Sequence, residues 1–313
     1  MEKILTNWLD VIKNGDVTNT YKMAWARAIV ECCVDDDPTE VVHFDRLAKK
    51  IFKYYWNQTI YFDLQQGSNP NKPPLLISYT KEKINEYRSE YGVQPEDFEK
   101  VDGKGRVQID LGRITRVLKK DVCYRFCKVG RTEYPLYVLD KGNSTIQVNS
   151  PSVVKEYADF LFEVINYRWV QIVENWDSSP RVAKKIRGTD QGNIKRKSLT
   201  QFHKYLELTD NRCFLSGEEF ASDQSDRSVD HVIPWSYLYS DDLWNLVFVK
   251  KAFNSSKSNS IVSEKVIERL ERRNERLLDI MTENGMSGGK QYSELKLAIE
   301  HNLLRKSWIN CKG

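Results

Sequence analysis

The sequence contains no apolar run of the roughly 18 residues that a membrane-spanning helix needs. Its opening residues, MEKILTNWLDVIKNGD, have neither the apolar core nor the cleavage site of a secretory signal. Histidine is scarce, with four residues in a chain of 313, and there are no internal repeats or low-complexity tracts. We therefore expect a cytoplasmic globular protein with no membrane partner.

The six cysteines do not follow a metal-binding pattern. Cys123 and Cys127 stand close together, but no second pair follows at the spacing of a zinc finger. Without a secretion signal, we expect all six to remain reduced thiols. Free cysteines are commonly buried, so we interpret them mainly as core residues rather than as zinc ligands.

The bulk composition is that of a soluble protein, with 40% apolar and 29% charged residues. Lys and Arg number 48 against 44 Asp and Glu, which gives a net charge of +4. This weakly basic balance permits a polyanionic partner such as nucleic acid but does not require one. The length is sufficient for about two domains.

Periodicity predicts a mainly helical α+β fold. Apolar residues recur at helical spacing near the N-terminus, in RLAKKIFKYYWNQTIYF (46–62) and in a long segment, 152–176. The stretches DVCYRFCKV, YPLYVL and TIQV, between 121 and 148, favour strands. We expect a helical N-terminal domain over 1–178, with a small β element, that docks a partner or nucleic acid.

Residues 179–197 predict a basic linker, with seven Lys and Arg residues against one acid. It could be a solvated connector or an arm that follows nucleic-acid phosphates, to which each cation would add salt-dependent affinity. The candidate phosphate-binding residues are Lys184, Lys185, Arg187, Lys195, Arg196 and Lys197.

The remaining residues, 198–313, predict a second domain. A short helix and a strand (RCFLSG) precede a strand that ends in DHVIP, followed by the strand NLVFVK and the helix AFNSSKSN. Two further helices, near 262–284 and 291–306, carry charges at helical spacing that we interpret as solvated faces.

A set of polar residues in this second domain predicts catalytic chemistry. Asp230 and His231 adjoin, Asn245 follows His231 by 14 residues, and Asn254 and Lys257 come after it. The spacing can place an imidazole, a carboxylate and a carboxamide around one divalent cation, an arrangement that suits phosphodiester hydrolysis. The alternative is a β-hairpin with polar turn residues, and a chance match of so many positions is rare.

The segment DHVIPWSYLYSDDLWNLVFVKKAFNSSK resembles the ββα-metal motif of the HNH endonuclease superfamily. Its spacing is especially similar to the HNH domains of type II CRISPR effector nucleases. In the N-terminal part, NTYKMAWARA and FKYYWNQ distantly resemble stand-alone HNH endonucleases of bacterial genomes.

This resemblance implies a role for each matching residue. His231 would be the general base, with a carbonyl on its other ring nitrogen to fix the tautomer. Asp230 and Asn254 would be metal ligands, and Asn245 a structural residue that ties the intervening loop. Lys257 would contact phosphate or remain solvated. The donors suit Mg²⁺ or Mn²⁺, and the products would carry a 5′-phosphate and a 3′-hydroxyl.

One departure from the family concerns structural zinc, which many relatives hold with two C-x-x-C pairs. Here Cys213 keeps one position, but Ser216, Lys250 and Phe253 occupy the others, so we do not expect a structural zinc. Asp241 and Asp242 we interpret as capping or turn residues of the loop.

The function we expect is a metal-dependent DNA endonuclease of bacterial defence. It would act alone or as the cleaving subunit of a larger complex with protein or guide-RNA partners. Two alternatives stay open at this point, a non-catalytic nucleic-acid-binding scaffold with an HNH fold and an RNA-cleaving HNH toxin. The choice of DNA over RNA depends on the family resemblance alone.

Overall fold

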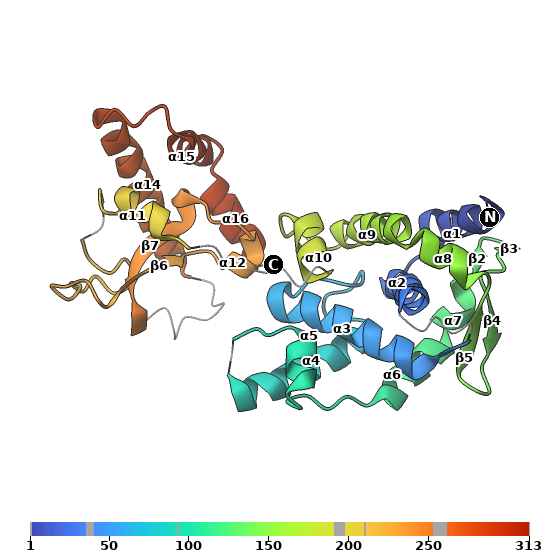
Figure 1. Ribbon diagram of the computed structural model, residues 1–313. Coiled ribbons are helices and arrows are strands. Elements are labelled where there is room, and N and C mark those ends of the chain that lie inside the picture. Colours follow the sequence, from blue (N-terminus) through green and yellow to red (C-terminus); the bar gives the residue numbers. More distant parts are fainter. Residues whose placement is uncertain are drawn as a thin grey trace. The chain divides into compact units, whose positions relative to one another are not determined.

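The computed structural model describes residues 2–35, 41–92, 94–190, 198–209, 211–252 and 262–312. The chain divides into two compact units (Figure 1). Unit 1 comprises Met1–Ser178 and Val182–Ile194, and unit 2 comprises Ser179–Arg181 and Lys195–Gly313. The predicted fold class, mainly helical α+β, is confirmed. None of the described helices is long and apolar enough to span a membrane.

Unit 1 is a helical array that carries a three-stranded antiparallel sheet of order β1-β5-β4 and a separate β2–β3 hairpin (Figure 1). Helix α3 is central, and α2, α4, α6 and α10 pack against it. The helices are α1 (Glu2–Asn14), α2 (Tyr21–Val34), α3 (Phe44–Phe62), α4 (Leu75–Tyr91), α5 (Phe98–Gly103), α6 (Leu111–Lys120), α7 (Val122–Arg125), α8 (Pro151–Glu156), α9 (Ala158–Glu174) and α10 (Val182–Asp190). The strands are β1 (Val41–His43), β2 (Lys128–Val129), β3 (Thr132–Glu133), β4 (Tyr137–Asp140) and β5 (Thr145–Val148).

The core of unit 1 encloses a polar network. The Thr20 hydroxyl and the Trp169 indole N–H both donate to Gln66 Oε1, at 2.8 and 3.0 Å, and Gln66 Nε2 donates to Gln58 Oε1 at 2.7 Å. These side chains are buried, so each donor or acceptor needs a partner inside the protein. Thr20 also stands at the N-cap of α2, but its hydroxyl serves this network instead of capping the helix.

Two predictions in unit 1 were wrong. The long helix expected over 152–176 is divided into α8 and α9, because Tyr157, at φ −101° and ψ 17°, leaves the helical conformation. The first part of the expected strand 121–129 is the helical turn α7, which packs on α2 and α6 and buries Val122 and Cys123. At α7, packing outweighs the local sequence pattern.

The predicted linker differs from the structure over 182–190. These residues form α10, which belongs to unit 1 and packs on α3 and α9. Val182, Ile186 and Thr189 are 1–3% exposed and recur at i, i+4 and i+7, so they form one buried stripe of the helix. Residues 191–197 lie outside the part of the chain that the structure describes.

Unit 2 is built around the antiparallel pair β6–β7, against which short helices and the C-terminal helices pack (Figure 1). Its elements are η1 (Thr200–Phe202), α11 (His203–Leu206), β6 (Arg227–His231), α12 (Trp235–Leu238), η2 (Leu243–Asn245), β7 (Leu246–Lys250), α14 (Glu264–Glu283), α15 (Lys290–Glu300) and α16 (Leu303–Lys312). The expected strand RCFLSG is instead a turn with one isolated bridge between Arg212 and Glu219. The expected helix AFNSSKSN falls almost wholly in 253–261, outside the described residues.

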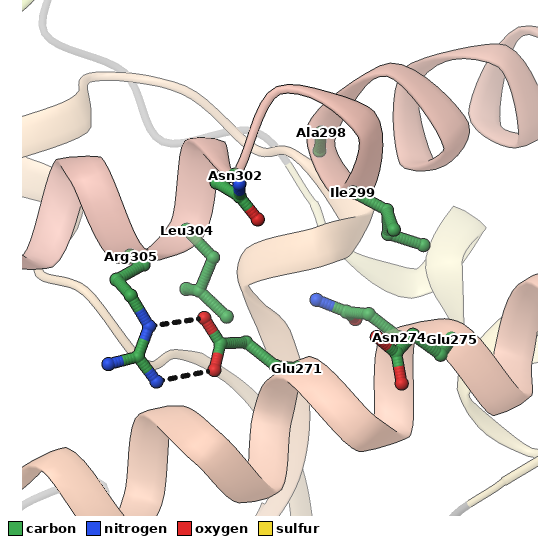
Figure 2. Close-up of a pocket in the computed structure, with 8 residues that line it drawn as sticks. All are labelled: Glu271, Asn274, Glu275, Ala298, Ile299, Asn302, Leu304 and Arg305. Atoms are coloured by element: carbon green, nitrogen blue, oxygen red, sulfur yellow. Dashed lines mark hydrogen bonds and ion pairs between the residues drawn. The ribbon is translucent and has the colours of Figure 1, made fainter.

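A cavity of about 260 Å³ lies between α14, α15 and α16 (Figure 2). On one side Arg305 donates to both carboxylate oxygens of Glu271, at 2.9 and 2.7 Å, and on another Asn274 and Glu275 project from α14. None of the residues that line it is a predicted site residue. The cavity therefore belongs to the packing of the C-terminal helices rather than to the polar set around His231.

Candidate active site

The end of β6 places the predicted catalytic pair. Asp230 lies opposite Val247 and His231 opposite Leu246 in the antiparallel ladder. Because side chains alternate along a strand, Asp230 and His231 flank β6 instead of sharing one face. His231 is 7% exposed, whereas Asp230 is half-buried. A ligand that engages both side chains would therefore have to reach both faces of β6.

Asn245 closes the loop that follows β6. Its side chain is fully buried, and its Oδ1 accepts from the Ile233 N–H at 2.8 Å while its Nδ2 donates to the Ile233 carbonyl at 2.9 Å. The Asn245 carbonyl accepts from the Val232 N–H at 2.9 Å. One residue thus satisfies three backbone groups next to His231. This geometry is what the structural role expected for Asn245 requires.

The imidazole of His231 contacts a carboxylate. His231 Nε2 lies 3.0 Å from Asp241 Oδ1, and the two side chains are 8% and 20% exposed. The family resemblance implied a carbonyl on the ring nitrogen that does not act as the base, and Asp241 was interpreted as a capping or turn residue of the loop. The neighbouring Asp242 holds the N-cap position of η2, where its carbonyl accepts from the Asn245 N–H at 2.9 Å. The Asp-Asp pair therefore divides into one residue that faces the histidine and one that begins the next element.

The loop that carries Asp241 is held by short contacts inside unit 2. Ser240 Oγ donates to Asp242 Oδ2 at 2.5 Å. Arg181 donates from Nη1 to the Leu238 carbonyl at 3.0 Å, and the same nitrogen lies 3.8 Å from Asp242 Oδ2. These contacts restrict the loop on either side of Asp241. The sequence placed Arg181 in a basic linker and gave no signal for this anchoring role.

Helix α14 fastens the segment that leads into β7, which was not predicted. Arg273 Nη2 donates to the Leu246 carbonyl at 2.6 Å, and Asn274 Nδ2 donates to the Trp244 carbonyl at 2.9 Å. Arg273 and Asn274 are 7% and 2% exposed, so the interpretation of the charges on this helix as a solvated face was wrong at Arg273. The carbonyls of η2 and β7 are buried and need donors, which α14 supplies.

Asp230 has the chemistry that a hard divalent cation prefers, since it offers carboxylate oxygens at the end of a strand. Within the described part of the chain, no three His, Cys, Asp or Glu side chains gather closely enough to hold a metal ion. A divalent ion beside Asp230 would therefore also need the carboxamide of Asn254, water or substrate phosphate as donors. Asn254 and Lys257 fall in 253–261, outside the described residues.

Cys213 occupies a position where the family resemblance implied a zinc ligand. Burial raises the pKa of its thiol, but hydrogen bonds from Ser216, Lys250 and Leu215 outweigh burial and hold the pKa below its ordinary value. The Lys250 backbone N–H lies 3.4 Å from the sulfur, while the Lys250 ammonium pairs with Glu218 at 2.8 Å. Lys250 thus provides an ammonium at a position where the resemblance implied a second cysteine pair. Phe253, at the fourth position, lies outside the described residues.

The predicted phosphate-binding residues on α10 are not equivalent. Lys184 is exposed, and Arg187 is exposed but pairs with Glu163 at 2.6 Å. Lys185 is fully buried, with its ammonium 5.8 Å from the centre of the Phe62 ring. The structure therefore does not support a phosphate contact by Lys185. The other three candidates, Lys195, Arg196 and Lys197, lie outside the described residues.

The comparisons with known proteins identify one segment. Residues 213–263 match the HNH endonuclease family. The match begins at Cys213 and includes Asp230, His231, Asn245 and Asn254. No curated protein and no solved structure matches the chain. The match supports an HNH domain with nuclease activity in unit 2, and it covers none of unit 1.

Proposed function

We propose that this chain is a divalent-metal-dependent HNH endonuclease that hydrolyses phosphodiester bonds of DNA. The observation that carries the proposal is the placement of His231 within the matched segment. Its backbone surroundings are fixed by Asn245, and its ring is fixed by Asp241. A solvated surface histidine would have neither constraint. This arrangement holds the imidazole in a fixed orientation, as a general base requires.

In this proposal His231 accepts a proton from a water molecule as the water oxygen attacks phosphorus in line with the leaving 3′ oxygen. The P–O3′ bond breaks and the leaving 3′ oxygen takes a proton from solvent water, so the products carry a 5′-phosphate and a 3′-hydroxyl. A divalent cation, Mg²⁺ or Mn²⁺, held by Asp230 and Asn254 would stabilise the negative charge of the phosphate and of the leaving oxygen. Asn245 acts only through the loop, and Lys257 would contact phosphate.

We further propose a role in bacterial defence against foreign DNA, either alone or as the cleaving subunit of a larger complex. The support is the similarity in spacing between residues 230–257 and the HNH domains of RNA-guided nucleases. Unit 1 would then dock a protein partner, a guide RNA or the substrate. The exposed Lys184, together with Lys195, Arg196 and Lys197, would follow the phosphate backbone.

The direct test is to incubate the purified chain with supercoiled plasmid, and separately with single-stranded RNA, in Mg²⁺, Mn²⁺ or EDTA. We expect plasmid cleavage with either metal and none in EDTA, with ends that a ligase can rejoin. Cleavage by the chain alone would argue against an obligatory partner. Cleavage of RNA alone would replace this proposal with an RNA-cleaving toxin. Binding without cleavage of either substrate in any metal would favour a non-catalytic scaffold.

A further inference from the structure

The contact between His231 and Asp241 carries an inference that goes beyond the assignment of a base. The Nε2–Oδ1 distance of 3.0 Å is that of a hydrogen bond, and the imidazole is 8% exposed. A carboxylate only accepts hydrogen bonds, and a neutral imidazole carries its single N–H on one of its two nitrogens. The contact therefore places the N–H on Nε2 and leaves the lone pair on Nδ1.

We propose that Asp241 is a positioning residue that selects the Nε2–H tautomer of His231, so that Nδ1 is the atom that takes the proton from water. This inference rests on the proposed function, because it assigns a role within that reaction. When Nδ1 accepts the proton, the ring acquires a positive charge. The adjacent carboxylate stabilises that charge more than a neutral carbonyl would.

The position of Asp241 in the fold supports this role. The residue lies ten positions after His231, on a loop restricted by the Ser240–Asp242 hydrogen bond and by the contacts of Arg181 with Leu238 and Asp242. A carboxylate on a freely moving loop could not hold one ring orientation. Here the backbone on both sides of Asp241 is fastened, and Asn245 fastens the backbone that follows His231.

The first test compares Asp241→Ala and Asp241→Asn in steady-state cleavage. The Asn side-chain oxygen can accept from Nε2–H but carries no charge, so it should preserve the tautomer while giving up charge stabilisation. We expect Asp241→Ala to lower kcat by about 10–100-fold, with KM changed by less than about twofold, and Asp241→Asn to recover a large part of that loss. The matched control is Asp279→Ala, an exposed carboxylate on α14, which should leave both constants unchanged.

The second test does not require cleavage. In protein labelled with ¹⁵N histidine, at a pH where the ring is neutral, the side-chain nitrogen shifts of His231 report which nitrogen carries the hydrogen. The signals are assigned by their loss in His231→Ala. We expect the Nε2–H form in the native chain and in Asp241→Asn, and a mixture of tautomers in Asp241→Ala.

The outcomes distinguish failure of the positioning role of Asp241 from failure of the proposed function. A native chain with the Nδ1–H tautomer, or an Asp241→Ala variant that keeps both the native tautomer and native kcat, would overturn the positioning role. A variant whose main change is a higher metal concentration for half-maximal rate would also overturn it, since that result makes Asp241 a metal ligand. If the native chain cleaves nothing yet shows the Nε2–H tautomer lost in Asp241→Ala, the proposed function fails while the contact stands.

Discussion

Substitution of Asn245 by Ala should destabilise the loop beside His231 far more than its small change in volume suggests. Asn245 is fully buried and makes two hydrogen bonds, of 2.8 and 2.9 Å, to the N–H and carbonyl of Ile233, which is itself 1% exposed. Alanine leaves both backbone groups buried without partners. Each unpaired group costs about 1–3 kcal/mol, so we expect a loss of about 2–5 kcal/mol, the upper end reduced by any water that enters the vacated space.

The assay is hydrogen exchange measured by mass spectrometry. Stability is read from peptides that cover 227–250, because these peptides report on unit 2 alone. In Asn245→Ala, exchange across β6, η2 and β7 should accelerate by about 30-fold or more, the equivalent of about 2 kcal/mol at 298 K. The matched control is Asn284→Ala, which removes one exposed hydrogen bond, from Asn284 Nδ2 to the Ile280 carbonyl at 2.7 Å. We expect that control to change stability by less than about 0.5 kcal/mol.

An Asn245→Ala variant that exchanged as slowly as the native chain, or that lost no more stability than the Asn284→Ala control, would refute this prediction. Either result would mean that the Ile233 backbone finds other partners at little cost. The loop would then not depend on Asn245. Unchanged exchange in unit 1 is expected in both variants, and it serves as an internal reference.

Two further predictions concern unit 1. Lys184→Ala should reduce the slope of log affinity for DNA against log salt by about 0.9, as expected for one lost phosphate contact. Lys185→Met should leave that slope unchanged because Lys185 is buried. Equal slope changes in salt titrations of both variants would contradict the burial of Lys185. Burial raises the pKa of Cys32 to about 11 and of Cys33 to about 12. Their protonated forms are favoured in the folded state, so this contribution to stability is fully present below about pH 9 and is lost as pH rises toward about 11–12. Urea unfolding at high pH should therefore show a smaller decline in a Cys32→Ala, Cys33→Ala double variant than in the native chain, and an equal decline would contradict the assigned pKa direction.

Local sequence patterns were sufficient to predict much of the fold. The apolar spacing of 46–62 predicted α3 closely, and the segments around Val229 and Val247 predicted the two strands that pair. The expected role of Asn245 likewise came from its place in the motif, and its side chain lies where it can fulfil that role. These features depend on residues near one another in sequence, which is the range over which such patterns act.

The features that were missed depend on tertiary contacts. Asp241 was interpreted as a turn residue because aspartate favours turns, and nothing in its neighbourhood indicates that it meets an imidazole. Lys185 stands in a basic run, and the run concealed a buried stripe at Val182, Ile186 and Thr189 that the i, i+4, i+7 spacing could have revealed. Arg273 lies on a helix rich in charge, where composition cannot distinguish a solvated arginine from one that donates to a buried carbonyl.

The central claim, that His231 is the base of a phosphodiesterase, is tested most directly by His231→Ala in a plasmid-cleavage assay with Mg²⁺ or Mn²⁺. The control is His301→Ala, an exposed histidine in the same unit. We expect the His231 variant to lose at least about 100-fold in cleavage rate while its DNA affinity changes by less than about twofold, and the control to cleave at the native rate. Cleavage by the His231 variant at the native rate would contradict the claim.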